Sequence, residues 1–244
     1  IYKTPQKMGE FMSLVKIMAI VLPIVAVVAY NNLSTAIIVF GITCILIFVV
    51  HPKTAPFAAL VSVGLVILLV GVQIISATMS TSKNFRMRRI IAWLNPEEYA
   101  AEGAYQTLQG LYAIGSGGIF GKGLGQSMQK MGFIPESHND MIFSIICEEL
   151  GLFGAVCLIL VFVALIFRML LIALNTEDLF GSLVVIGFMT HIAIQVFINI
   201  AVVTNTIPPT GIPLPFISYG GTSILVVMIE MGIVLSISKK IHIR

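Results

Sequence analysis

Asp140 is the residue whose chemical type and position point most directly to catalysis. It closes a polar stretch, PESHND at residues 135–140, and an apolar run beginning MIFSII follows it. A carboxylate at the end of a membrane helix can accept a proton from a sugar hydroxyl or bind a divalent cation. Ser137 and Asp140 also have the spacing of a capping box, which would make Asp140 the third residue of a helix. The spacing leaves both roles open, and they are compatible.

A glycine-rich stretch lies just before this acid. Nine glycines fall between residues 103 and 132, and the densest part reads GSGGIFGKGLG at residues 115–125. It is not a Walker nucleotide loop, because Lys122 is followed by Gly123 rather than by Ser or Thr. Its backbone amides, with Lys122 and Lys130 nearby, can surround phosphate oxygens. The glycines can equally let a re-entrant segment at residues 105–114 turn back, and the sequence does not decide between the two.

Polar side chains inside apolar segments form a second group of candidates. They are His191, Gln195, Asn199, Glu148, Glu149 and Glu230. Polar groups are costly inside a membrane, so each needs a partner or a water-filled cavity. The first three recur at every fourth position, which places them on one face of a helix and directs that face into the bundle. Hydrogen bonds between helices explain this row better than direct contact with a substrate.

Two more segments carry candidate binding residues. Arg86, Arg88 and Arg89 form a basic cluster in the same long polar segment as Glu136. Guanidinium groups can contact phosphate oxygens in bidentate fashion, and lysine is an imperfect substitute.

The other segment follows a proline-rich turn. Four prolines lie between residues 204 and 216, too many to continue a helix, and SYGGTS at residues 218–223 then opens the last apolar run. Its polar and small residues, Ser218 and Tyr219 among them, either contact a ligand or let two helices approach closely.

The elements that must hold these residues are membrane helices. Of the 244 residues, 58% are hydrophobic and 10% are charged, and the mean hydropathy is +1.03. Six apolar runs reach or approach the length of a spanning helix: residues 11–30, 33–50, 56–76, 141–172, 179–203 and 216–238. Such runs exclude a soluble enzyme, a disordered chain and a transmembrane barrel. The sequence therefore predicts an all-α integral membrane protein, a polytopic helical bundle with six spans.

Basic residues indicate the orientation of this bundle. Those that flank the spans are Lys3, Lys7, Lys16, Lys53, Arg168, Lys239, Lys240 and Arg244. They share one side if the spans alternate, so the positive-inside rule makes both termini cytoplasmic. We expect spans one to three in residues 1–76 and a large extracytoplasmic loop with re-entrant or short helices in residues 77–140. Spans four to six and a cytoplasmic C-terminus occupy residues 141–244.

Together, these stretches resemble the SEDS family, the shape, elongation, division and sporulation proteins. The matching stretches lie at residues 89–96, 105–106, 113–118, 121–125, 135–136 with 139–140, 148–151 and 211–221. They follow the family's order, and the FtsW division branch is the most similar. The family has more spans, so the resemblance implies that its N-terminal spans are missing before Ile1. The stretch NNLSTA at residues 31–36 also departs from the family's QPDLGTA and lacks its acid.

The resemblance implies a peptidoglycan glycosyltransferase that polymerises lipid II into glycan strands during cell division. Asp140 matches the family's essential acid, which is proposed to deprotonate the attacking sugar hydroxyl. We expect Lys122 and the arginine cluster to hold the diphosphate of the lipid substrates. No cofactor is implied with certainty, and a divalent cation, Mg²⁺ or Mn²⁺, stays open, with Asp140 as its ligand.

The implied partners are proteins and lipids. They are lipid II, the growing undecaprenyl-diphosphate glycan, a class b penicillin-binding protein and other division proteins. The net charge of +3 gives no indication of nucleic acid binding. The implied location is the bacterial cytoplasmic membrane at the division septum, with the active site on the outer face.

Two other functions fit part of the sequence. A flippase for the lipid-linked precursor would also have polar rows and interrupted helices. The absence of a visible inverted repeat and the position of Asp140 at an outer edge favour the enzyme over the flippase. A non-catalytic membrane subunit of the division complex is the other alternative, because of the missing spans.

Overall fold

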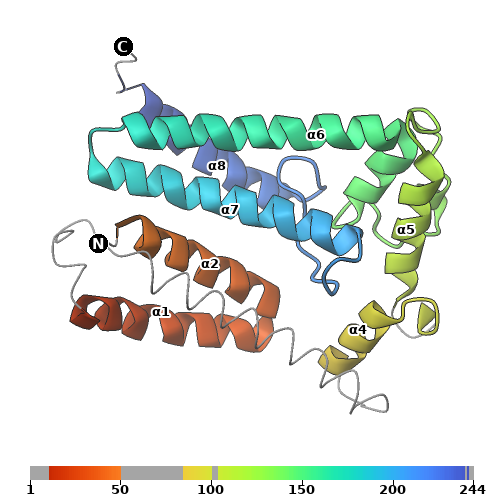
Figure 1. Ribbon diagram of the computed structural model, residues 1–244, viewed down its shortest axis with the longest axis horizontal. Coiled ribbons are helices and arrows are strands. Elements are labelled where there is room, and N and C mark those ends of the chain that lie inside the picture. The colour runs from red at the N-terminus through yellow and green to blue at the C-terminus, as the bar shows by residue number, and fades with distance from the viewer. Residues whose placement is uncertain (1–10, 51–84, 101–103, 240, 242–244) are drawn as a thin grey trace. The chain divides into compact units, whose positions relative to one another are not determined.

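The helices of the described residues confirm the predicted all-α class. The structure, a computed structural model, describes residues 11–50, 85–100, 104–239 and 241, without the side chains of residues 11–15 and 85–89. The elements are α1 (Phe11–Asn31), α2 (Leu33–Val50), α4 (Phe85–Leu94), α5 (Tyr105–Gly117), the short 3-10 helix η3 (Gln129–Met131), α6 (Ile142–Asn175), α7 (Leu179–Val203) and α8 (Gly221–Ser238) (Figure 1). None of the described residues lies in a strand.

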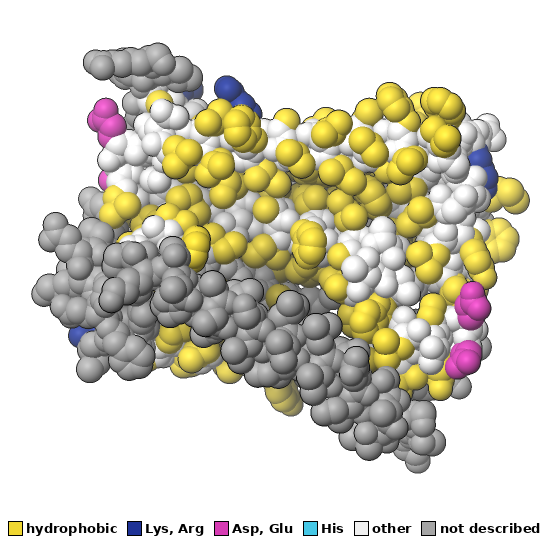
Figure 2. All heavy atoms as spheres, in the orientation of Figure 1, with side chains coloured by type: hydrophobic (Ala, Val, Ile, Leu, Met, Phe, Trp, Pro, Cys, Tyr) yellow, Lys and Arg dark blue, Asp and Glu magenta, His cyan; other side chains and the backbone are white. Residues whose placement is uncertain are grey.

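Membrane spans account for most of these helices. The helices α2, α6, α7 and α8 are long and apolar enough to cross a membrane, and α1 covers another predicted span. Hydrophobic side chains are spread over much of the described surface in the view of Figure 2, as expected for helices in contact with lipid. The predicted span at residues 56–76 lies outside the described residues.

The last span begins later than the hydropathy pattern predicts. Helix α8 starts at Gly221 rather than at residue 216. Phe216 has a φ of 64°, which is incompatible with a right-handed helix, and the prolines before it cannot donate helical hydrogen bonds. Residues 216–220 therefore belong to the proline-rich turn, and so do Ser218 and Tyr219.

The chain forms two compact units. The first comprises residues 1–59, 162–195 and 221–244, so it holds α1, α2, α8 and one part each of α6 and α7. Within it, α2 packs closely on α7: a methyl group added at Gly41 would lie 2.9 Å from Ile194 Cδ1. A small residue at this position thus permits the close helix approach that is common between membrane helices.

The second unit comprises residues 60–161 and 196–220. It holds α4, α5, η3, the first part of α6, the end of α7 and the proline-rich turn. Of these, α4, α5 and η3 fall in residues 77–140, the segment predicted to be a large loop with re-entrant or short helices. Residues 105–114, predicted as a re-entrant segment, form most of α5.

Candidate active site

Asp140 lies in a turn rather than inside a helix. Helix α6 begins at Ile142, and residues 132–141 form successive turns and a bend before it. Asp140 is thus not the third helical residue, and the capping-box prediction is wrong. Turns give the chain freedom that a helix does not, and here they bring a half-buried carboxylate against residues from two other segments.

The first of these segments is α5. Gln106 donates a hydrogen bond from Nε2 to Asp140 Oδ1 at 3.3 Å, and Nε2 also lies 3.4 Å from the carbonyl oxygen of Pro135. The amide therefore orients the carboxylate and braces the start of the turn. Sequence reasoning did not single out Gln106 as a site residue, although residues 105–106 belong to the stretches that carry the family resemblance.

The second segment is the proline-rich turn. Gly211 has a φ of +71°, and a methyl group added there would lie 3.7 Å from Asp140 Oδ2. Only glycine adopts this conformation readily. The backbone of the turn thus approaches Oδ2 of the carboxylate, whereas Gln106 contacts Oδ1.

Asn199, at the end of α7, ties the two turns together. Its Nδ2 donates to the carbonyl oxygens of Asp140 at 2.7 Å and of Ile212 at 2.8 Å. The residue is 1% exposed, and its Oδ1 has no hydrogen-bond partner among the described residues. The inward orientation is the one that its place in the polar row of α7 predicts.

Ser218 and Tyr219 strengthen the same junction. The Ser218 hydroxyl donates to the carbonyl oxygen of Asn139 at 2.6 Å and accepts the Leu214 amide at 2.7 Å. The Tyr219 amide donates to the carbonyl oxygen of His138 at 2.8 Å, and the two rings meet edge to face with centroids 5.3 Å apart. Ser218 is buried while the Tyr219 side chain is exposed, so of the two only Tyr219 presents its side chain to a ligand.

Glu136 lies in the same series of turns as Asp140 and forms a hydrogen bond with Asn139. Its side chain accepts a hydrogen bond from Asn139 Nδ2 at 2.7 Å and is exposed. Its φ of 49° is uncommon for a residue other than glycine. Glu136 therefore shapes the turn and remains open to solvent.

The glycine-rich stretch docks on a break in α6. Gly151 has a φ of 68° and a ψ of −168° inside that helix, which interrupts the helical hydrogen bonds there. The amides of Lys122 and Gly123 donate to the carbonyl oxygens of Glu148 and Glu149, both at 2.9 Å. In return, the Leu152 and Phe153 amides donate to the carbonyl oxygens of Gly118 and Ile119 at 2.9 and 3.0 Å. The break was not predicted from the sequence.

Glycine is required at this break because two backbones touch. A methyl group added at Gly151 would lie 2.4 Å from the amide nitrogen of Gly121 and 2.4 Å from the carbonyl oxygen of Ile119. Real side chains never approach so closely without displacement of the backbone. At least some of the loop glycines therefore serve close backbone packing.

The predicted lysines pair with the two acids on α6. Lys122 Nζ lies 2.7 Å from Glu148 Oε1, and Lys130 Nζ lies 2.5 Å from Glu149 Oε1. Glu148 is 0% exposed and also accepts the Ser127 hydroxyl at 2.5 Å. The costly acids of this apolar helix thus have the partners that they require. Both lysines remain about one third exposed, at 34% and 32%.

The arginine cluster lies on α4, and its side chains are outside the described residues. Trp93 Nε1, later on the same helix, donates to the carbonyl oxygen of Asn205 at 2.9 Å. Asn205 Nδ2 is in turn 3.4 Å from the carbonyl oxygen of Trp93. This pair fastens α4 to the turn that follows α7 within the second unit.

His191 pairs with Glu230, the buried acid on α8. Its Nδ1 lies 2.9 Å from Oε1 and 3.1 Å from Oε2 of Glu230. Gln195, one turn further along α7, has a buried Oε1 without a partner among the described residues. These three residues belong to the first unit, whereas Asn199 and Asp140 belong to the second.

A metal centre built from protein ligands alone is not found in the described part of the chain. No three His, Cys, Asp or Glu residues come together there in a way that could hold an ion. Mg²⁺ often uses only one or two carboxylates together with substrate phosphates. Asp140 can supply one such carboxylate, so a cation shared with a diphosphate stays a prediction.

The fold and this site describe a polytopic helical membrane protein with a braced carboxylate at the start of a spanning helix. Comparison with known proteins assigns it more narrowly. Residues 3–242 match the family of cell cycle proteins that comprises FtsW, RodA and SpoVE. The chain belongs to this family.

Individual relatives agree with this assignment. The chain is 42% identical over 208 residues to stage V sporulation protein E of Bacillus subtilis, covering 85% of this chain and 55% of that protein. It is 34% identical over 242 residues to the probable peptidoglycan glycosyltransferase FtsW of a Geobacter species, strain M18, covering 98% and 64%. The chain thus spans about half to two thirds of the length of these curated relatives.

Solved structures show the same fold. A chain of a peptidoglycan synthase complex matches with a TM-score of 0.70 at 24% identity, covering 95% of this chain and 63% of that one. A variant of the rod shape determining protein RodA from Thermus thermophilus matches with a TM-score of 0.61 at 23% identity, covering 99% and 63%.

Proposed function

We propose that this chain carries the glycosyl-transfer site of a peptidoglycan glycosyltransferase that polymerises lipid II during cell division. The observation that carries the proposal is the Asp140 carboxylate, held by Gln106 at 3.3 Å in a turn that Asn199 and Ser218 anchor. Relatives named peptidoglycan glycosyltransferase FtsW, which share 34–47% of their residues with the chain over the matched lengths, support the same conclusion.

The chemistry assigned to Asp140 is general-base catalysis. A hydroxyl of one lipid-linked sugar attacks the anomeric carbon of another, and a new glycosidic bond forms. The bond from that carbon to the diphosphate breaks, and undecaprenyl diphosphate leaves with the electron pair. Asp140 takes the proton of the attacking hydroxyl. Gln106 donates to Oδ1 of this carboxylate and would keep it oriented toward the attacking hydroxyl.

Cationic side chains would hold the diphosphate. The arginines of α4 suit this role best, because guanidinium groups bind phosphate oxygens in pairs. Lys122 and Lys130 are secondary candidates, since each already neutralises an acid on α6. Tyr219 and Glu136 are exposed beside Asp140 and would contact the sugars. If a Mg²⁺ or Mn²⁺ ion takes part, Asp140 would be its ligand, and the ion would neutralise charge on the substrate diphosphate.

The location and partner follow from the same proposal. The membrane fold and the basic residues that flank the spans support an active site on the outer face of the membrane. The bacterial cytoplasmic membrane and the division septum are proposed from the similarity to relatives named FtsW. A class b penicillin-binding protein and other division proteins are the proposed partners. The polymerised glycan would pass to that penicillin-binding protein for cross-linking.

A reconstitution experiment tests the proposal against its alternatives. The chain is purified with its penicillin-binding protein partner, placed in vesicles and supplied with lipid II. Glycan strands support the enzyme. Translocation of lipid II without polymer would instead indicate a flippase, and neither product would indicate a non-catalytic subunit.

The acid itself is tested with Asp140→Asn. Positioned proton transfer contributes about 10²- to 10⁴-fold, so polymerisation per folded protein should fall by that factor. Asparagine keeps the shape and an oxygen for Gln106, and the backbone contact to Asn199 is untouched, so folding should persist. Ser137→Ala, in the same turn, is the matched control and should keep its activity. Near-normal polymerisation by Asp140→Asn would refute the assignment.

A further inference from the structure

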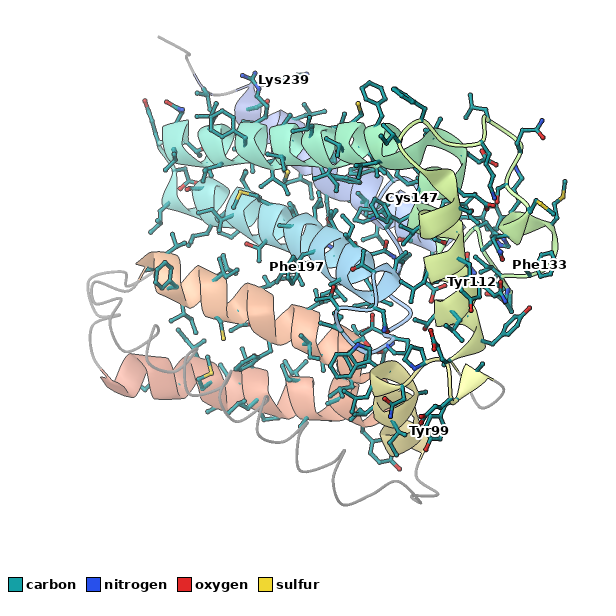
Figure 3. The ribbon with its side chains drawn as sticks, turned by 45° about the vertical axis from the view of Figure 1, so that its right-hand side comes forward. Tyr99, Tyr112, Phe133, Cys147, Phe197 and Lys239 are labelled. Carbon is teal, nitrogen blue, oxygen red and sulfur yellow. The ribbon has the colours of Figure 1, made fainter. Side chains whose placement is uncertain are left out.

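The segment between α5 and the turn of Asp140 has an unusual surface for a connecting loop. Residues 118–133, here called the apolar loop, expose large hydrophobic side chains: Ile119, Phe120, Leu124, Met128, Met131 and Phe133. Phe120 is 81% exposed, and Phe133 is labelled in Figure 3. Exposed apolar groups of this density indicate contact with a membrane or with another protein.

The two charged side chains of the apolar loop are paired with acids and only about one third exposed. Lys122 and Lys130 are its only two Lys, Arg, Asp or Glu residues, and both pair with acids on α6. A loop surrounded by water would show the reverse arrangement, with charges outside and apolar groups covered. Because each lysine is neutralised by a carboxylate, the loop presents little net charge to its surroundings.

The apolar loop also continues the lipid-facing surface of α6. The amides of Leu152 and Phe153 donate to carbonyl oxygens of the loop, so Ile119 and Phe120 lie next to this part of the helix. Both Leu152 and Phe153 are exposed, and Leu160, two turns further on, is exposed too. In a helix that is long and apolar enough to cross a membrane, such a face is expected to contact lipid. The exposed side chains of loop and helix therefore form one surface.

We propose that the apolar loop binds a lipid surface, with Ile119, Phe120 and Leu124 inserted at the boundary between headgroups and acyl chains. Irregular backbone is not stable in the hydrocarbon core but is accommodated at the interface, where water satisfies its amides. Apolar side chains can enter the acyl region from that depth. The occupant is bulk lipid, and no specific headgroup is required because the lysines are already paired.

The proposal assigns a membrane depth to the site as well. Asp140 lies seven residues after Phe133, the last residue of the apolar loop. The loop and Asp140 both belong to the second unit. Insertion of the loop would hold this unit at the interface, where the diphosphate of a lipid-linked sugar lies. This placement does not depend on Asp140 being catalytic, since it follows from exposure, charge pairing and the surface of α6.

Fluorescence in vesicles tests the insertion. The chain has one tryptophan, Trp93, so Phe120→Trp and, separately, Leu124→Trp are made in a Trp93→Phe background. Each protein is reconstituted into phosphatidylethanolamine and phosphatidylglycerol vesicles, with or without lipids brominated on the acyl carbons nearest the headgroup. Glu98→Trp, at an exposed polar position of the same unit, is the control.

The expected result is blue-shifted emission for Phe120→Trp and Leu124→Trp, with quenching by brominated lipid about twofold or more above that of the control. Water-like emission without quenching at both positions would overturn the proposal. Blue-shifted emission that brominated lipid does not quench would overturn it in favour of a protein partner or a second copy. If Phe120→Trp does not fold, Leu124→Trp decides alone. None of these readouts requires glycan synthesis, so they stand apart from the test of Asp140.

Discussion

Replacement of Lys122 by methionine separates a structural role for this lysine from a substrate-binding one. The side chain reaches Glu148 Oε1 at 2.7 Å, and Glu148 is fully buried. Methionine keeps much of the length of the side chain and removes the charge. If the lysine mainly neutralises Glu148, Lys122→Met should destabilise the fold, because a buried carboxylate loses its cation.

The size of the effect follows from the burial of the two partners. Loss of one member of a fully buried pair costs about 3–5 kcal/mol, and an exposed pair contributes about 0–1 kcal/mol. Lys122 is 34% exposed and Glu148 is not exposed at all, so the pair lies between these limits. The Ser127 hydroxyl and the Gln129 amide still donate to Glu148 after the change. We expect Lys122→Met to lower the free energy of unfolding by about 2 kcal/mol.

A double-mutant cycle measures the pair itself. Glu148→Gln removes the charge but keeps the shape, so Lys122→Met/Glu148→Gln should be less destabilised than the sum of the single variants, with a coupling of about 1–2 kcal/mol. Unfolding is followed in mixed micelles as denaturing detergent is added. Lys130→Met is the matched comparison and should cost less, because Glu149 is 13% exposed.

The affinity for lipid II tests the alternative, that Lys122 binds the substrate. A lysine that binds diphosphate would leave the unfolding free energy unchanged and would weaken lipid II binding in the single and the double variant alike. A coupling below about 0.5 kcal/mol, which is the usual error of additivity, would refute the structural role. Equal lipid II binding by Lys122→Met and the parent chain would refute the substrate-binding one.

Two other perturbations address the carboxylate and the helix break. Gln106→Leu should lower kcat for polymerisation by about tenfold without raising KM, because it removes one hydrogen bond to a charged group. If Gln106→Leu lowered kcat further in the Asp140→Asn background, a role through Asp140 would be contradicted. Gly151→Ala should destabilise the fold by about 3 kcal/mol, from backbone overlap and a positive φ. Gly115→Ala is the control, because a methyl group there meets no atom within 4 Å, and it should be neutral or stabilising. Equal free energies of unfolding for the two glycine variants would contradict the close packing at Gly151.

Hydropathy was sufficient to predict the helices but not their interruptions. The apolar runs predicted α1, α2, α6, α7 and α8, because a membrane requires each spanning segment to satisfy its own backbone. The break in α6 escaped prediction because a glycine inside an apolar run is common in membrane helices. Its φ of 68° depends on a loop that is distant in sequence. The late start of α8 has a similar cause, since Phe216 adopts a positive φ only within a folded turn.

The candidate site was predictable in its parts and not in its contacts. The cost of polar groups in a membrane predicted that Asn199 faces inward and that Glu148 needs a partner or a water-filled cavity; Asn199 is buried and Glu148 has a partner in Lys122. The partners were not predictable, because the contacts join residues far apart in the chain. Gln106 and Asp140 are separated by 34 positions, His191 and Glu230 by 39, and Asn139 and Ser218 by 79. Helical periodicity carries information only over neighbouring turns.

The break at Gly151 explains three features that the sequence presented separately. It opens the carbonyl groups of Glu148 and Glu149 to the amides of Lys122 and Gly123, which accounts for glycines at the points of contact. It sets the side chains of both acids beside the lysines, which accounts for charges inside an apolar helix. Amides that already donate to α6 are not available to phosphate oxygens, since each N–H makes one strong hydrogen bond. The loop backbone is therefore a weaker candidate for holding the diphosphate than the arginines of α4.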